Sequence, residues 1–355
     1  MKPARETWVN PVLALALCAL SGSLFRALRV PLPWMIGPLL AMAACNFAGA
    51  GLRALPGGRA AGQVVIGTAL GLYFTSAVSR QVVSFWPVLL VAGVFAMLLG
   101  VVSGWVLARL GETDTKTAFF ASVPGGAAEM TLLGERYGAR PDRVALGQSL
   151  RILAVVVVVP FALTYSGVHG SDAYQPAPTP VAYGGLAALL ALAVSAGLLV
   201  NRLGMPNAFM FGPLALVIAL TANGVELSAM PSVLSNAAQV LIGCALGSRF
   251  ERRSLQSAPR YVAAVLASVF VAMACTVLFA ALLGWAAGLP VPSLVLAMAP
   301  GGIAEMCITA KVLQLGVPLV TAAHVTRVIV LITGTGPSYR LAGRLFRHVR
   351  TRNTL

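Results

Sequence analysis

Charged residues are scarce in this sequence: they make up 10% of the chain, and only 10 of its 355 residues are Asp or Glu. A typical soluble domain carries roughly 25% charged residues, so this chain is poorly equipped to cover a folded surface in water. The mean hydropathy of +0.87 agrees with this deficit. Together these values exclude a water-soluble globular enzyme and favour an integral membrane protein.

The few charges present are mostly basic. Lys and Arg number 25, which gives a formal net charge of +15. In a soluble protein this excess would suggest a nucleic-acid partner. In a membrane protein the same excess marks the loops that face the cytoplasm. The positions of the basic residues along the chain distinguish these two explanations.

Patterns that bind metal ions are also missing. The three histidines, His169, His324 and His348, lie far apart in the sequence and form no HExxH motif. The five cysteines are scattered, mostly within apolar runs, and form no CxxC pair, as expected of small buried hydrophobic residues. We therefore expect no metal, no cofactor and no enzymatic activity.

Self-comparison of the sequence reveals an internal duplication. Four blocks recur in the same order at a spacing of 175 or 176 residues. The matched blocks are Gly37-Pro38-Leu39 with Gly212-Pro213-Leu214, Gln63–Gly71 with Gln239–Gly247, Pro124–Met130 with Pro300–Met306, and Arg151 with Arg327. We therefore predict two homologous halves: a first membrane repeat at 1–175, and a second at 176–355 that ends in a short basic cytoplasmic tail.

Each half contains six apolar segments, and most of them are long enough to cross a bilayer as helices. The segments lie at about 10–28, 32–51, 61–78, 84–108, 117–135, 144–165, 181–201, 207–225, 236–250, 260–286, 293–312 and 318–338. The third segment of each half carries glycines at GxxxG spacing, which allow helices to approach closely. The pattern predicts an all-α, polytopic membrane protein.

The distribution of Lys and Arg predicts the topology. If the fifth segment of each half re-enters on its own side and the other five cross, 19 of the 25 basic residues face the cytoplasm. Four then lie outside, and Arg151 and Arg327 remain within the membrane. Both termini become cytoplasmic, and the two halves take opposite orientations. Inverted repeats with interrupted segments are the architecture of secondary transporters.

The interruptions in the fifth segments are the first candidate site. They consist of Pro124, Gly125 and Gly126 in one half and of Pro300, Gly301 and Gly302 in the other. After each break a helix begins with free N–H groups and the positive end of its dipole. Glu129 and Glu305 fall in this first turn, and a carboxylate within a membrane is a functional candidate. Each either caps its helix or neutralises an arginine, or it coordinates a cation or carries a proton.

Other polar groups in the apolar segments extend this candidate site. Arg151 and Arg327 can each pair with the glutamate of the same half, or one of them can bind an anionic substrate group. His324 lies three residues before Arg327, where it is either simply hydrogen-bonded or a titrating group for proton coupling. Gln63 and Gln239 lie near the start of the Gly-rich third segments, and we expect both to line a water-accessible cavity at the candidate site.

The repeated blocks also carry a family resemblance. The block Pro33–Leu39, its partner Met205–Pro213 and the two Pro-Gly-Gly-x-Ala-Glu-Met sequences resemble the membrane AbrB family, from about residue 11 to 345. That family shares only its name with the small DNA-binding AbrB regulators. The resemblance implies a bacterial inner-membrane protein with a link to regulation of gene expression. It also implies a fold similar to those of cation/proton antiporters and anion transporters, and it transfers no catalytic residues.

Two functions fit these features. The leading hypothesis is a secondary transporter or exporter of a small polar solute, coupled to H⁺ or Na⁺ at the paired breaks. The alternative is a membrane-embedded regulator or sensor, as one label of the family suggests. Another label, ammonia monooxygenase, fits poorly because three dispersed histidines leave little to bind catalytic copper or iron. The expected partners are the lipid bilayer, the solute and its coupling ion, without nucleic acid; a homo-oligomer is left open.

Overall fold

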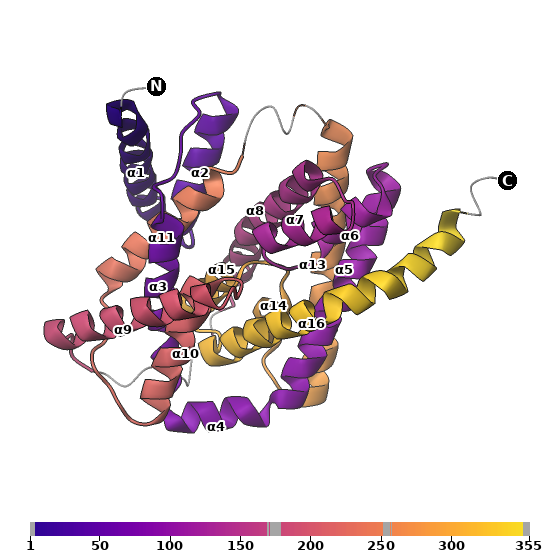
Figure 1. The fold of residues 1–355 in the computed structure, drawn as a ribbon. Helices are drawn as coiled ribbons and strands as arrows, with labels where there is room; N and C mark the ends of the chain where they lie inside the picture. Colours follow the sequence, from indigo (N-terminus) through magenta and orange to yellow (C-terminus); the bar gives the residue numbers. More distant parts are fainter. Residues whose placement is uncertain (1–3, 169, 171–178, 251–255, 257, 351–355) are drawn as a thin grey trace. The chain divides into compact units, whose positions relative to one another are not determined.

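The computed structural model describes residues 4–168, 170, 179–250, 256 and 258–350, and these residues form helices and connecting loops without strands (Figure 1). Each of the twelve expected apolar segments contains helix, which confirms the all-α prediction. The helices are α1 (Ala4–Ala27), α2 (Pro33–Phe47), α3 (Gly58–Gly71), α4 (Ser76–Ser84), α5 (Trp86–Leu110), α6 (Thr115–Ser122), α7 (Ala127–Arg136), α8 (Pro141–Tyr165), α9 (Tyr183–Arg202), α10 (Ala208–Ala222), α11 (Ser232–Gly247), α13 (Pro259–Ala287), α14 (Val291–Met298), α15 (Ile303–Leu313) and α16 (Val317–Arg350).

Six of the described helices are long and apolar enough to cross a membrane. They lie within α1, α5, α8, α9, α13 and α16. A seventh candidate is the pair α3 and α4, which bend by 91° at a short break. The chain is therefore a multi-pass membrane protein. The helices α2, α10 and α11 are apolar but shorter. The sequence predicts ten crossings, and the helix lengths alone do not test that number.

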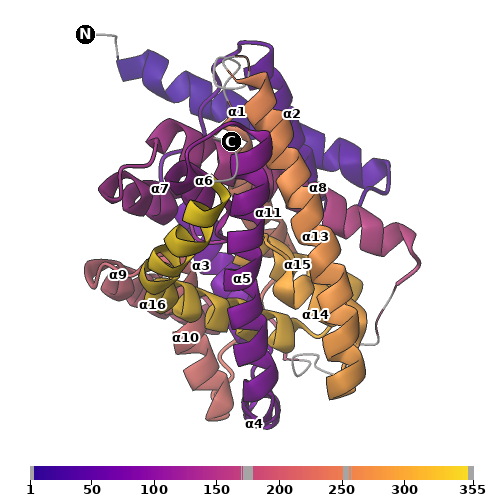
Figure 2. The same ribbon diagram turned by 90° about the vertical axis from the view of Figure 1, so that its right-hand side faces the viewer.

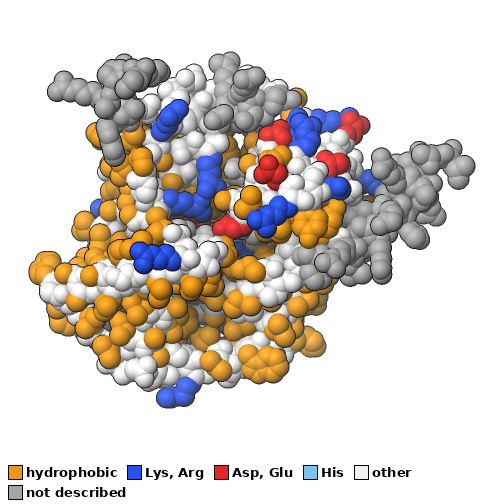
Figure 3. Space-filling view, in the orientation of Figure 1, with side chains coloured by type: hydrophobic (Ala, Val, Ile, Leu, Met, Phe, Trp, Pro, Cys, Tyr) orange, Lys and Arg blue, Asp and Glu red, His pale blue; other side chains and the backbone are white. Residues whose placement is uncertain are grey.

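Helix α13 shows how the surface suits lipid. Trp285 is 88% exposed, and Leu278 and Leu282 are also exposed on the same helix. On the face of the molecule shown in Figure 3, hydrophobic side chains cover much of the surface, and most of the visible Asp and Glu gather beside Lys and Arg. Apolar side chains that would be costly in water are favourable against a bilayer, so this surface agrees with the membrane assignment.

The described residues form two compact units, and neither corresponds to one half of the sequence. The first unit comprises Met1–Val83, Pro160–Ser254 and Cys307–Pro318. The second comprises Ser84–Val159, Leu255–Met306 and Leu319–Leu355. Each unit thus takes its helices from both sequence halves. The division of the sequence at residue 175 remains a prediction about ancestry.

Close glycine contacts hold the first unit together. A Cβ atom at Gly67 in α3 would overlap the Met210 carbonyl of α10, and one at Gly243 in α11 would overlap the Met35 carbonyl of α2. The Gly-rich face of each third segment therefore packs on the second segment of the other half. These contacts show a packing role for both GxxxG pairs. A small core of Ala14, Cys18, Met42, Val240 and Cys244 lies beside them.

The second unit contains the two interrupted segments. Its long helices α5 and α13 lie side by side (Figures 1 and 2), and the rings of Phe95 and Phe279 stack between them at 4.1 Å. A buried cluster surrounds the first interruption and contains Phe119, Phe120, Val123, Met130, Ala139, Val144 and Leu331. Helix α16 continues to Arg350, so the expected basic tail begins as helix, and residues 351–355 lie outside the described residues. Residues 169 and 171–178, in the connection between α8 and α9, also lie outside them.

Candidate functional site

Both Pro-Gly-Gly sequences interrupt a helix, as the sequence predicts. Helix α6 ends at Ser122 and α7 begins at Ala127; α14 ends at Met298 and α15 begins at Ile303. The residue that follows the first helix has an extended ψ in both cases, 127° at Val123 and 137° at Ala299. Each interruption therefore exposes the carbonyl end of one short helix and the N–H end of the next.

Two side chains of the following helix fold back over each break and lie against its glycines. A Cβ atom at Gly125 would lie 2.8 Å from the Met130 side chain, and one at Gly126 would overlap the Glu129 carboxylate. The second break repeats this arrangement: Gly301 lies against Met306, and Gly302 against Glu305. Each Glu is the third residue of its helix, the position from which an acidic side chain reaches back toward the N-cap. This geometry accounts for the Gly-Gly-x-x-Glu-Met spacing and agrees with the capping alternative.

The two glutamates differ in exposure. Glu305 is only 3% exposed, whereas Glu129 is half-buried. A buried carboxylate within a membrane protein is costly unless it is hydrogen-bonded, paired or neutralised by a proton or cation. Glu305 is therefore the more deeply buried carboxylate of the two and the stronger functional candidate.

Arg151 and Arg327 bind the carbonyls of the breaks. Arg151 donates from Nη1 to the Val123 carbonyl at 2.8 Å and from Nη2 to the Gly125 carbonyl at 3.4 Å. Arg327 donates in the same way to Ala299 at 2.8 Å and to Gly301 at 2.9 Å. Both arginines are 4% exposed. A cation at the C-terminal end of a helix satisfies carbonyls that have no partner in the helix and complements the negative end of its dipole.

This arrangement corrects one of the two pairings that the sequence suggests. Among the described residues, Arg151 forms no ion pair with Glu129; its guanidinium instead donates to the two backbone carbonyls. The physical reason is that each glutamate folds over the N–H end of its break, whereas each arginine reaches the carbonyl end.

Gln148 and His324 perform the same task in their respective halves. Gln148 Nε2 donates to the Phe120 carbonyl at 2.7 Å and to the Val123 carbonyl at 2.9 Å. His324 Nε2 lies 3.0 Å from the Leu296 carbonyl. Because a carbonyl only accepts, Nε2 of His324 carries the hydrogen. His324 is therefore hydrogen-bonded, as one of the two alternatives requires, and a proton-coupling role would fall on Nδ1.

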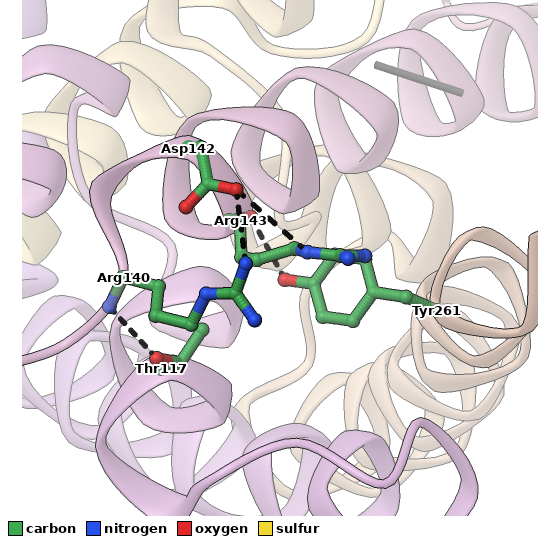
Figure 4. A network of polar contacts seen from close by, with 5 residues as sticks. All are labelled: Thr117, Arg140, Asp142, Arg143 and Tyr261. Carbon is green, nitrogen blue, oxygen red and sulfur yellow. Dashed lines mark hydrogen bonds and ion pairs between the residues drawn. The ribbon is translucent and has the colours of Figure 1, made fainter. Parts of the chain in front are cut away.

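A polar network fixes the start of the helix that carries Arg151 (Figure 4). The Tyr261 hydroxyl of α13 donates to the Arg143 carbonyl of α8 at 2.8 Å, and the Arg143 guanidinium lies over the Tyr261 ring at 5.1 Å. The Arg140 amide donates to the Thr117 hydroxyl of α6 at 2.9 Å. Asp142 pairs with Arg140 at 3.5 Å and with Arg143 at 3.8 Å. Sequence reasoning counted these arginines only as topology markers.

The two breaks meet at a small cavity. Pro124 and Pro300 both line a space of about 10 Å³, together with Arg151, Ser103 and Ser122. In the described part of the chain, three buried atoms on this lining have no hydrogen-bond partner: Arg151 Nε, Ser103 Oγ and Ser122 Oγ. Roughly 10–15 Å³ is enough for one water molecule. The two serines were not predicted, since a serine within an apolar helix gives no distinctive sequence signal.

The remaining sequence candidates stay predictions. Gln63 in α3 and Gln239 in α11 belong to the first compact unit, and neither is among the residues that line the small cavity. Among the residues described, no group of three or more His, Cys, Asp or Glu is arranged to hold a metal ion.

Comparison with known proteins places these features in a family. The family model described as "Transition state regulatory protein AbrB" matches residues 34–343, which is most of the chain. The chain belongs to the AbrB family. This AbrB-family chain is 28% identical to the protein YhjN of Bacillus subtilis (strain 168) over 304 residues, which cover 81% of this chain and 79% of YhjN. It is 27% identical to the Escherichia coli (strain K12) protein named "Putative regulator AbrB" over 278 residues, which cover 77% and 80% of the two chains.

Proposed function

We propose that this AbrB-family protein is a secondary transporter of a small polar solute in a bacterial inner membrane, coupled to H⁺ or Na⁺, and not an enzyme. One observation carries the proposal: Pro124 and Pro300, from two interrupted helices, line the same buried cavity with Arg151. Interrupted helices that meet within the bilayer are how transporters hold a solute, and the space of about 10 Å³ described here must widen to admit one.

The matched contacts of the two sequence halves support an inverted repeat. In both halves an arginine clamps the carbonyl end of a break, and a glutamate covers its N–H end. In both halves the glycine-rich third segment packs on the second segment of the other half. In the proposal, the halves have opposite orientations, both termini are cytoplasmic, and the breaks enter from opposite sides of the membrane.

The residues at the breaks divide the proposed work between them. Arg151 and Arg327 hold the carbonyl ends in place. Arg151 also lines the cavity and gives it positive charge, which favours an anionic group of the solute. The hydroxyls of Ser103 and Ser122 supply further donors toward this space. Glu305, buried beside its break, takes up the coupling proton or Na⁺, and the gain or loss of that charge shifts the equilibrium between inward and outward states.

Proteoliposomes test this proposal. The purified chain is reconstituted, and amino acids, small carboxylates and ammonium are screened for flux under an imposed pH or Na⁺ gradient. We expect at least one solute to move only with the gradient, and Glu305→Gln to abolish the coupling. Glu135→Gln, which changes an exposed carboxylate of α7, is the matched control and should behave as the wild type. The proposal would be contradicted if the flux of every solute were independent of the gradient, or if Glu305→Gln retained coupled flux.

The second candidate function is a membrane regulator of gene expression, favoured by the name of the Escherichia coli relative. As a regulator, the protein binds a ligand among its membrane helices, and the resulting conformational change reaches the cytoplasm through the C-terminal end of α16. Deletion of residues 346–355 distinguishes the two functions. A transcript profile that changes while solute flux remains normal favours the regulator, and an unchanged profile favours transport alone.

A further inference from the structure

The first compact unit contains a second, larger cavity. Its volume is about 120 Å³, and it is lined from α3, α10, α15 and the connection that precedes α11. By the measure on which roughly 10–15 Å³ holds one water molecule, this space holds several waters and is large enough for a small organic solute. All of its lining residues belong to this one unit.

Two opposite charges face this cavity without neutralising each other. Lys311 of α15 and Glu226, which follows α10, both line it. Within the described ranges no ion pair joins them, because none of the ion pairs there includes either residue. Lys311 is half-buried, and its ammonium lies 6.0 Å from the centre of the Tyr73 ring, at the outer limit of a cation–π contact. Glu226 is exposed at the cavity edge.

Two hydroxyl groups of the lining, those of Thr221 and Ser228, are already engaged by the backbone. Thr221 Oγ1 lies within hydrogen-bonding distance of two backbone carbonyls that can accept its hydrogen, 3.0 Å from that of Phe74 and 2.9 Å from that of Val217. Ser228 Oγ accepts from the Ala182 amide at 3.1 Å and donates to the Ala229 carbonyl at 3.0 Å. The groups that offer a ligand full charge are therefore the ammonium of Lys311 and the carboxylate of Glu226.

The internal duplication does not account for this pair. Glu135 stands 176 residues before Lys311, and Ala50 stands 176 residues before Glu226. The features shared by the two halves, such as the glycine packing and the arginine clamps, explain how the helices fit together. The shared packing of the helices does not require a charged pair that is present in only one half. The pair also has an energetic cost, because it places a half-buried cation beside a cavity.

We propose that this cavity binds a small zwitterion, with its carboxylate on Lys311 and its ammonium on Glu226. A solute with both charges fits a cavity whose opposite charges face the same space without forming an ion pair. A simple anion would leave Glu226 to repel it, and a simple cation would be repelled by Lys311. The assignment is independent of the transport proposal, since it concerns other residues and requires only binding.

Calorimetry on the full chain in detergent tests the assignment with three probes. They are L-alanine, propionate, which lacks the ammonium of alanine, and isopropylammonium, which has a methyl group in place of its carboxylate. We expect alanine to bind saturably, and the two single-charge probes to bind at least tenfold more weakly. Lys311→Met and Glu226→Gln should each weaken alanine binding at least tenfold. Lys116→Met and Glu135→Gln, which change exposed residues of α6 and α7, should leave it unchanged.

Two outcomes would overturn the assignment. Equal binding of propionate, with no effect of Glu226→Gln, would make the cavity an anion site. No binding of any of the three probes would remove the site altogether. If Lys311→Met fails to fold, the exposed Glu226→Gln variant decides alone. Binding without coupled flux would leave this inference standing and count against the transport proposal.

Discussion

The two buried arginines show most clearly what single residues contribute. Sequence alone located Arg151 and Arg327 and marked them as unusual, because a charge in an apolar helix is conspicuous. It did not identify their acceptors, since backbone carbonyls leave no mark on the sequence. The glutamates were the visible partners, yet Arg151 donates to the carbonyls of Val123 and Gly125. The buried positive charge is thus stabilised by dipoles of the broken helix.

A side chain added at the second glycine of each break should displace the glutamate carboxylate that covers it. In Gly302→Ala the new methyl group would meet the Glu305 carboxylate, and we expect a loss of about 1–3 kcal/mol in stability, seen as a lower melting temperature in detergent. Gly184→Ala is the control, because nothing lies within 4 Å of a Cβ atom there. The double variant Gly302→Ala/Glu305→Ala should recover part of the loss. An unchanged melting temperature of Gly302→Ala would contradict the fold-back of Glu305.

The equivalence of His324 and Gln148 gives a substitution that separates structure from proton coupling. His324→Gln should preserve the hydrogen bond to the Leu296 carbonyl, since Gln148 makes the same contact in the first half. We expect the melting temperature to stay close to that of the wild type. If Nδ1 carries a coupling proton, the pH dependence of flux should change in this variant. A large loss of stability would show that the imidazole is needed for packing.

At the scale of helices, sequence reasoning succeeded where the signal was local. Long apolar runs located every expected helical segment, and Pro-Gly-Gly located the two interruptions, because proline and glycine act on the backbone where they occur. It could not predict which helices pack together. The contact of α3 with α10, and of α11 with α2, joins residues far apart in sequence that match only through the smallness of glycine.

Adding one methyl group should therefore separate these helix pairs. Gly243→Ala would place its Cβ against the Met35 carbonyl, and Gly67→Ala would do the same at Met210. Because the obstacle is backbone, the helices must move apart, and we expect each variant to lose about 1–3 kcal/mol. Thermal melting beside Gly184→Ala measures the effect. Two variants as stable as that control would show that these helices are not in close contact.

At the scale of the whole molecule, the two compact units each draw on both halves of the chain. Such an exchange was not predictable from the predicted duplication, which concerns the similarity of two segments in sequence and not their packing. The charge distribution along the sequence does predict orientation, because basic residues resist translocation. It assigns the loop between α5 and α6 to the cytoplasm and the corresponding loop between α13 and α14 to the other side.

Cysteine labelling in oriented membrane vesicles tests this inversion. Thr113→Cys lies between α5 and α6, and Ala287→Cys lies at the end of α13, in corresponding regions of the two halves. In a chain without its own cysteines, an impermeant thiol reagent should label the first only from the cytoplasmic side and the second only from the opposite side. Labelling of both from one side would refute the inverted repeat.

The central claim is that the cavity between the two breaks opens alternately to the two sides of the membrane. Ser122 lines this cavity and is 7% exposed, so a cysteine at this position can react only when the cavity opens. The most direct measurement is the reaction of Ser122→Cys with an impermeant thiol reagent, added to one side at a time, in the cysteine-free background. The account predicts labelling from each side, whereas Thr113→Cys labels from one. Labelling of Ser122→Cys from one side only, or from neither, would contradict the account.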